Sequence, residues 1–169
     1  GNTETRTSGV YGNGKYVITG TGATYNYSSN LTTWSTGTLP LTADWRLAFG
    51  NGIFVGLGYG TNRLIYSYDG INWSIGNVSS SVGANWTKVK YGNGKFVVSN
   101  VSGWASVISV DGINWFGTSA PSGLNGNQIS VEYGNGTYVI NDDNNAYTFS
   151  IDGITWNTAY STGGNYDAG

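Results

Sequence analysis

The 169-residue chain contains no histidine, no cysteine and no methionine. Without histidine and cysteine it can form no imidazole general base, no thiol nucleophile, no disulfide bridge and no Cys/His zinc site. Much of enzyme chemistry is excluded with these two residue types. Because methionine is also absent, we expect the chain to be a processed or excised piece of a longer product.

Charge and long apolar runs are scarce as well. Charged residues make up 9% of the chain, with 7 basic and 9 acidic side chains, so the basic surface that binds nucleic acid is not expected. No apolar run approaches the roughly 18 residues of a membrane helix, and we expect no membrane insertion. With 2 prolines, 28 glycines and 15% aromatic residues, the composition favours short strands and tight turns in one domain.

Two motifs recur about every 40 residues and divide the chain into four units. The first motif places an aromatic residue before Gly-Asn-Gly and ends in valine, at Tyr11–Val17, Phe49–Val55, Tyr91–Val97 and Tyr133–Val139. The second motif reads Ser-x-Asp-Gly-x-x-Trp in its full form. Together with the apolar or aromatic residue before its serine, it occupies Tyr66–Trp73, Ile108–Trp115 and Phe149–Trp156, with an eroded copy at Tyr27–Trp34.

Each motif contains a hairpin signal, because Asn-Gly and Asp-Gly accept the positive φ angles of a type I′ turn. A unit therefore predicts four strands, named a to d. In the third unit these are Trp86–Tyr91, Lys95–Val101, Ala105–Val110 and Ile113–Gly117. Four-stranded units at this period predict a β-propeller of four blades, in one domain with blades at about 5–38, 39–80, 81–123 and 124–160.

The Ser-x-Asp-Gly-x-x-Trp strings resemble the Asp-box repeat of sialidase-type propellers, and the whole pattern resembles propeller repeats of bacterial surface proteins and phage tail or adhesin proteins. In that family the Asp box is a structural hairpin between the third and fourth strands. The resemblance therefore implies a fold, not catalysis. We expect two structural sets: carboxylates bound in their own turns (Asp69, Asp111, Asp152) and tryptophans packed between blades (Trp34, Trp73, Trp115, Trp156).

Enzymatic activity is not expected. Sialidase chemistry needs an arginine cluster, a tyrosine nucleophile with a glutamate partner and an aspartic acid/base. The chain has three arginines and two glutamates, Glu4 in the first residues and Glu132 one residue before the aromatic residue of a Gly-Asn-Gly turn, where we expect it on the structural face. We also expect no cofactor and no catalytic or structural metal.

The face opposite the repeated turns carries the variable loops, and variable loops on a rigid scaffold commonly bind ligands. The b–c loops are predicted at Gly20–Thr24, Gly58–Arg63, Asn100–Trp104 and Asp142–Asn145, and the d–a connections at Gly37–Asp44, Asn77–Asn85, Ser119–Asn127 and Ala159–Asp167. The side chains with binding chemistry in these loops are Tyr59, Asn62, Arg63, Asn100, Trp104, Asp142, Asp143, Asn144 and Asn145.

Two of these features have alternative interpretations. Trp104 has no counterpart in the other units; beside Asn100 it could stack on a sugar, or it could plug the loop end of its blade. The acidic segment Asp142–Asn145 offers oxygen ligands for Ca²⁺, but it lacks EF-hand spacing and the completing Gly and Glu, so the calcium interpretation is the weaker one.

The sequence thus favours a non-catalytic recognition module that binds a glycan or cell-surface receptor, as an adhesin domain of a phage tail or bacterial surface protein, extracellular or on a virion. A structural or assembly domain that contacts other subunits or itself is the alternative; a glycoside hydrolase is favoured less. For ring closure we expect a closed four-bladed monomer, the alternatives being part of a larger propeller and two chains joined into an eight-bladed ring.

If Trp104 anchors a ligand, Trp104→Ala leaves the fold intact and weakens binding by roughly 1–3 kcal/mol. Titration calorimetry with the ligand and a thermal melt measure the two effects. A melting temperature lower by many degrees would show instead that the indole belongs to the core.

Overall fold

The computed structural model describes residues 5–79, 85–100, 106–119, 123–124, 127–158 and 160–161. These ranges contain strands, turns and bends but no helix, so the all-β prediction is confirmed, and they include no helix able to span a membrane. The strands are β1 (Arg6–Gly12), β2 (Lys15–Ser28), β3 (Ser35–Gly50), β4 (Ile53–Gly58), β5 (Leu64–Ser67), β6 (Ser74–Ile75), β7 (Asn77–Val78), β8 (Trp86–Gly92), β9 (Lys95–Asn100), β10 (Val107–Ser109), β11 (Asn114–Gly117), β12 (Gln128–Gly134), β13 (Thr137–Asp142), β14 (Ala146–Ser150) and β15 (Tyr160–Ser161).

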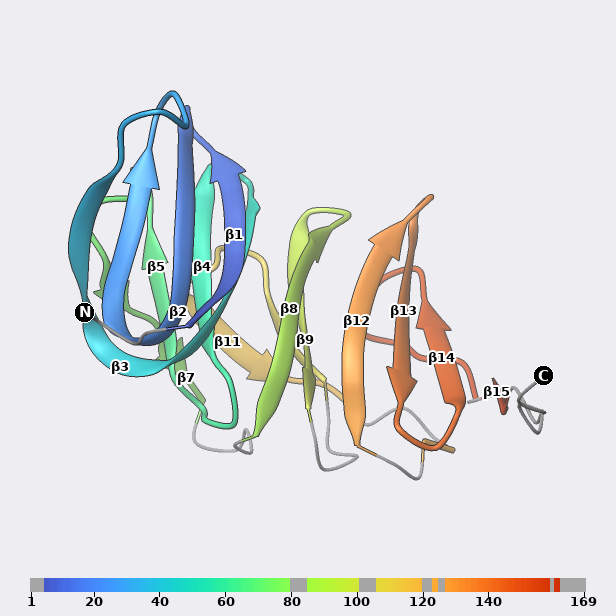
Figure 1. The fold of residues 1–169 in the computed structure, drawn as a ribbon. Coiled ribbons are helices and arrows are strands. Elements are labelled where there is room, and N and C mark those ends of the chain that lie inside the picture. Colours follow the sequence, from blue (N-terminus) through green and yellow to red (C-terminus); the bar gives the residue numbers. More distant parts are fainter. Residues whose placement is uncertain are drawn as a thin grey trace, which may run out of the picture.

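Each of the second, third and fourth units forms an antiparallel meander in chain order (Figure 1). The second unit consists of the latter half of β3 with β4, β5 and β6, the third of β8 to β11, and the fourth of β12 to β15. The short strand β7 adds to β11 in parallel. The hairpins predicted from Asn-Gly and Asp-Gly are therefore present in these three units.

The first unit is arranged differently. The first half of β2 pairs with β1, and its second half pairs with the first half of β3, so that two hairpins follow one another along a 14-residue strand. The predicted loop at Gly20–Thr24 is part of this strand, because Thr21 and Gly22 pair with Asp44 and Ala43. The predicted connection Gly37–Asp44 likewise lies inside β3.

The units lie side by side along an arc, and their first strands β1, β3, β8 and β12 are neighbours (Figure 1). The sheets do not close: in the described residues no strand pairing joins β1 to the fourth unit, which lies at the other end of the arc. The closed ring expected from sequence is thus not seen. Filled layers of side chains join the first unit to the second, the second to the third and the third to the fourth, and in the described residues no such layer joins the fourth unit to the first.

The Gly-Asn-Gly turns also join one unit to the next. In each turn the asparagine and the second glycine have positive φ, as a type I′ turn requires. The first glycine has a different role, since the aromatic ring of the following unit lies directly on it. A Cβ atom added there would lie 2.2 Å from Phe49 at Gly12, 1.9 Å from Tyr91 at Gly50 and 2.2 Å from Tyr133 at Gly92.

The aspartates of the second motif are bound in their own turns. Asp111 accepts hydrogen bonds of 2.8 Å from the backbone N–H of both Ile113 and Asn114, and Ser109 donates to it at 2.9 Å. Burial alone would raise the pKa of Asp111, but these hydrogen bonds outweigh it and lower the pKa to about 2. Asp69 and Asp152 make equivalent bonds, and their pKa values are also lowered.

The four repeated tryptophans occupy one position in the motif but have different environments. Trp115 is 1% exposed in the cluster between the second and third units, and Trp73 and Trp156 are partly buried at the junctions with the units before them. Trp34 is 39% exposed, so the prediction that it packs in the core was wrong. Trp73, Trp115 and Trp156 each pack against the unit that precedes their own. No unit precedes the first one, so Trp34 has no such neighbour among the described residues.

This difference predicts unequal effects of two matched substitutions. Trp115→Ala is expected to lower the free energy of unfolding by about 3–5 kcal/mol, because it empties a filled junction. Trp34→Ala is expected to cost less than about 1 kcal/mol in dilute solution, since its ring faces solvent. Urea denaturation measures both, and equal losses would contradict the assignment of the junctions.

Low pH is expected to destabilise the fold through the turn aspartates. The pKa of Asp111 is about 2 when folded, against an ordinary value of 3.8, so its contribution is present above about pH 4 and is lost as the pH falls through 2. At pH 5, Asp111→Asn should therefore lower the free energy of unfolding by about 1 kcal/mol, and this difference should shrink toward zero near pH 2. A difference that stays constant over this range in urea titrations would contradict the account.

Candidate binding groove

The inner strands of the arc line a groove of about 650 Å³. Its walls come from the four inner strands β1, β3, β8 and β12 and from the loop that carries Tyr59. The lining residues are Thr7, Ser8, Gly9, Val10, Arg46, Leu47, Ala48, Phe49, Tyr59, Thr87, Lys88, Val89, Lys90, Tyr91, Ile129 and Glu132.

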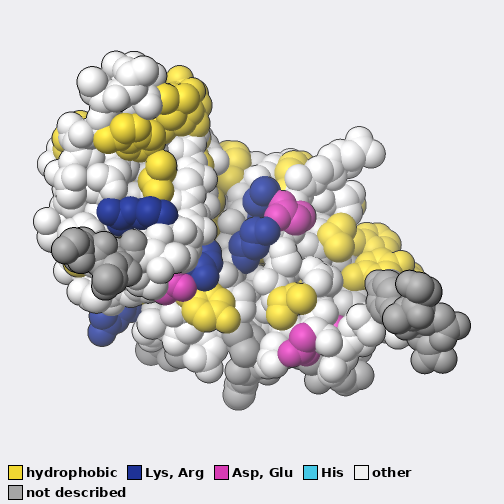
Figure 2. Space-filling view, viewed as in Figure 1, with side chains coloured by type: hydrophobic (Ala, Val, Ile, Leu, Met, Phe, Trp, Pro, Cys, Tyr) yellow, Lys and Arg dark blue, Asp and Glu magenta, His cyan; other side chains and the backbone are white. Residues whose placement is uncertain are grey.

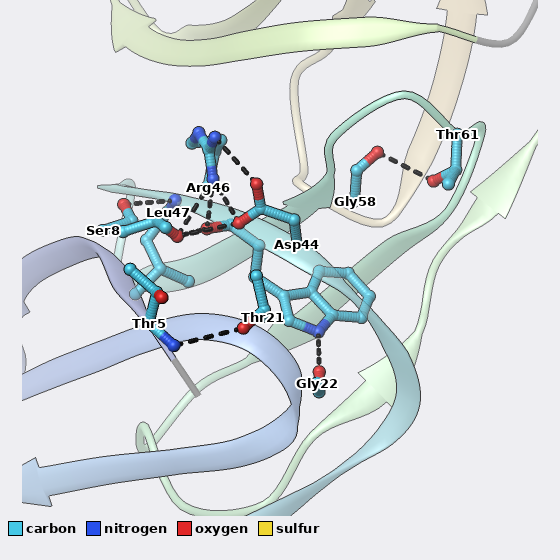
Figure 3. Close-up of polar contacts among 11 residues, drawn as sticks. Thr5, Ser8, Thr21, Gly22, Asp44, Arg46, Leu47, Gly58 and Thr61 are labelled. Carbon is cyan, nitrogen blue, oxygen red and sulfur yellow. Dashed lines mark hydrogen bonds and ion pairs between the residues drawn. The ribbon is translucent and has the colours of Figure 1, made fainter. Parts of the chain in front are cut away.

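Arg46 and Asp44 form a fixed ion pair at one side of this groove (Figure 3). The two guanidinium nitrogens of Arg46 donate to the two carboxylate oxygens of Asp44 at 2.6 and 3.0 Å, and Thr7 Oγ1 donates to the same carboxylate at 2.9 Å. Partial burial would raise the pKa of Asp44, but the bonds from Arg46 and Thr7 lower it below its usual value. Both charges are therefore held in place before any ligand arrives.

A second charged group lies across the groove on β8 and β12. Glu132 accepts from Lys88 through one carboxylate oxygen and from Lys90 through the other, the latter at 2.6 Å. Burial would raise the pKa of Glu132, and the two lysines lower it overall. Basic and acidic side chains meet near the middle of the visible face (Figure 2). Three basic side chains (Arg46, Lys88, Lys90) and one acidic side chain (Glu132) line the groove, and Asp44 pairs with Arg46 beside it, so this group has one more basic than acidic side chain, whereas the whole chain has a net charge of −2.

Tyr59 places an aromatic ring at the edge of the groove. Its backbone N–H donates to the carbonyl of Asp44 at 2.7 Å, and the next residue, Gly60, donates to the carbonyl of Trp86 at 2.9 Å. The loop is therefore anchored to the inner strands of two units. The ring is 47% exposed, and the Arg46 guanidinium lies 5.0 Å from its centroid.

The other candidates of the second and third units are less favourably placed. Asn62 and Arg63 are exposed on the same loop as Tyr59, and Arg63 donates to the carbonyl of Thr42 at 3.3 Å. Asn100 is buried, so its side chain is not presented to solvent. Trp104 lies outside the described residues. Of the candidates in these two units that the structure describes, only Tyr59 lines the groove.

The loop of the fourth unit forms a separate cavity of about 430 Å³, lined by Asp142, Asp143 and Asn145 among others, with Asn144 exposed beside it. Asp142 is buried and accepts from the backbone of its own loop, while Asp143 accepts two bonds of 2.8 Å from Asn127. No three acidic side chains converge on a metal site within the part of the chain that the structure describes. The eight predicted residues that the structure describes are thus not gathered in one site, although Ile129 lines both cavities.

Sequence reasoning missed the charged residues of the groove. Glu132 was expected on the face of the repeated turns, but its side chain points into the groove because side chains alternate along β12. A signal was available. Lys88 and Lys90 alternate with Val89 and Tyr91, so the two lysines share the face of the strand that does not pack in the core.

No protein-family model and no curated protein matches the chain. Solved structures do. YCF48 from Cyanidioschyzon merolae matches with a TM-score of 0.71 and 17% identity over 95% of this chain and 58% of that chain; YCF48 also has a structure with a D1 peptide bound. Virginiamycin B lyase from Staphylococcus aureus matches with a TM-score of 0.77 and 12% identity over 92% of this chain and 55% of the lyase chain. The GH74 enzyme of Niastella koreensis matches with a TM-score of 0.61 and 16% identity over 90% of this chain and 24% of the enzyme chain.

These likenesses show the fold, which is that of β-propeller proteins. The chain spans little more than half the length of YCF48 and of the lyase, and about a quarter of the GH74 enzyme. Because a lyase, a glycoside hydrolase family member and a peptide-bound protein share this architecture, the function must be argued from the site.

Proposed function

We propose that the chain is a non-catalytic recognition module that binds a glycan in the groove between the inner strands. The observation that carries the proposal is the exposed ring of Tyr59 at the edge of a 650 Å³ groove whose walls hold fixed donors and acceptors. A sugar presents a C–H face that packs on an aromatic ring, and hydroxyl groups that both donate and accept hydrogen bonds. The groove offers partners for each.

The charges of the groove refine the ligand class. Lys88, Lys90 and Arg46 supply donors, while Glu132 and Asp44 supply acceptors. Each of these charged side chains is paired with one of opposite sign, so the electric field of the groove is weak, and the groove offers hydrogen-bond donors and acceptors to a polar ligand. The excess of one positive charge favours a glycan with an acidic substituent over a neutral one.

The remaining parts of the proposal rest on the sequence. We assign four blades to the chain, with Asp-box-like hairpins, and place it outside the cell or on a virion, as an adhesin domain of a phage tail or bacterial surface protein. A role in assembly is the second candidate. It is favoured by the exposed apolar side chains at both ends of the arc, which Figure 2 shows at the upper left and at the right edge.

Tyr59→Ala is expected to weaken glycan binding about tenfold, because the sugar loses its stacking surface. A glycan array identifies a bound sugar, and titration calorimetry then compares the wild type with the variant. Tyr68→Ala is the matched control, since the Tyr68 ring is also exposed and does not line the groove.

The binding proposal fails if the array gives no signal above background. The placement of the site fails if a glycan binds but Tyr59→Ala and Tyr68→Ala weaken binding equally. A dissociation constant that does not rise with added salt would contradict the preference for an acidic substituent.

A further inference from the structure

The contact between an aromatic ring and a glycine occurs at all three internal junctions. At each, a Cβ atom on the first glycine of the turn would overlap the ring of the next unit. The valine that ends the motif is fully buried at the same junctions, at Val17, Val55 and Val97. A side-chain amide strengthens two of them: Asn13 donates to Gly52 O and Tyr68 O at 2.8 and 2.7 Å, and Asn93 donates to Ile151 O at 3.2 Å.

In the fourth unit these features have no partner among the described residues. A Cβ atom at Gly134 would have nothing within 4 Å, and its φ is not in the left-handed region. Val139 is 40% exposed where its three counterparts are buried. Beside it, Tyr147 and Phe149 stack on Tyr160 with ring centroids 5.6 and 6.1 Å apart. This apolar end face has the composition of an internal junction.

The first unit presents the complementary features. The aromatic residue before its Gly-Asn-Gly turn already packs on the aromatic residue after the turn: the ring centroids of Tyr11 and Tyr16 lie 4.5 Å apart. In the next unit the ring centroids of Phe49 and Phe54 lie 4.7 Å apart. Tyr11 is nevertheless 56% exposed, and no glycine of the described residues lies beneath its ring. The two rings line an apolar groove of about 300 Å³ together with Gly9, Val10, Val17, Ile18, Leu31 and Trp34.

We propose that the two end faces dock on each other in a second copy of this chain, with Tyr11 of one copy on Gly134 of the other. Two such contacts close two arcs into one ring. The relative lengths support this occupant: the chain superposes on YCF48 and on virginiamycin B lyase while spanning 58% and 55% of their lengths. Those two proteins are therefore longer than one copy of this chain and shorter than two, so a second copy supplies enough residues to complete a ring.

The end contact differs from the internal ones at one position. Leu31, with φ of 64°, stands where the later units have Gly70, Gly112 and Gly153, which lie against the valine of the preceding unit. A Cβ at Gly70 would already lie 3.0 Å from Val17. Leu31 therefore requires a small adjustment against Val139 of the second copy, and Leu31→Gly is expected to tighten the pairing.

The test measures mass by sedimentation equilibrium from micromolar to millimolar protein, with no ligand added. The wild type is expected to form a two-chain species and nothing larger. Gly134→Ala should raise the dissociation constant of the pair by about a hundredfold or more, because the added Cβ would overlap the Tyr11 ring. Its melting temperature in dilute solution should not fall, since the position is open in the single chain. Tyr11→Ala should also weaken the pair, and Tyr68→Ala should leave it unchanged.

The proposal is overturned if the wild type remains a single chain at millimolar concentration. It is also overturned if Gly134→Ala pairs as strongly as the wild type, or if the mass grows without limit, because that result would mean head-to-tail filaments and not a closed ring. None of these outcomes depends on a ligand in the groove between the inner strands, so the glycan proposal stands or falls separately.

Discussion

The structure depends on one contact, the aromatic ring of each unit lying on the first glycine of the preceding Gly-Asn-Gly turn. Any side chain at Gly12, Gly50 or Gly92 would occupy the space of that ring. The contact fixes how closely two sheets approach at their inner strands, and the buried valines and tryptophans fill the layer farther out. The same contact thus sets the distance between units, the curvature of the arc and the width of the groove between the inner strands.

Much of the fold could be predicted from the sequence because its turns are specified locally. Asn-Gly and Asp-Gly determine hairpins through backbone conformation, and the resulting meanders in the last three units match the prediction. The continuous strand β2 and the open arc could not be predicted in this way. Both depend on pairing and packing between residues far apart in the sequence, such as Thr21 with Asp44.

The site was predicted only in part, for a related reason. Variable loops are visible in a sequence as departures from a repeat, and Tyr59 was found by that criterion. Lys88, Lys90 and Glu132 lie inside the repeated strands, where a charge is readily taken for a solvated face. Their meeting in one groove follows from the arrangement of β8 and β12, which no single unit reveals. Asn100 shows the opposite error, because a polar residue at a loop is buried.

The account's central claim, that the ring-on-glycine contact is completed between two chains, is tested most directly by disulfide formation. The chain has no cysteine, so every disulfide must come from introduced residues. When the single variants Tyr11→Cys and Gly134→Cys are mixed and mildly oxidised, the account predicts a covalent pair containing one chain of each. Either variant alone should stay uncross-linked, because its two cysteines lie at opposite junctions of the ring. Cross-linking of each variant with itself, or none in the mixture, would contradict the account.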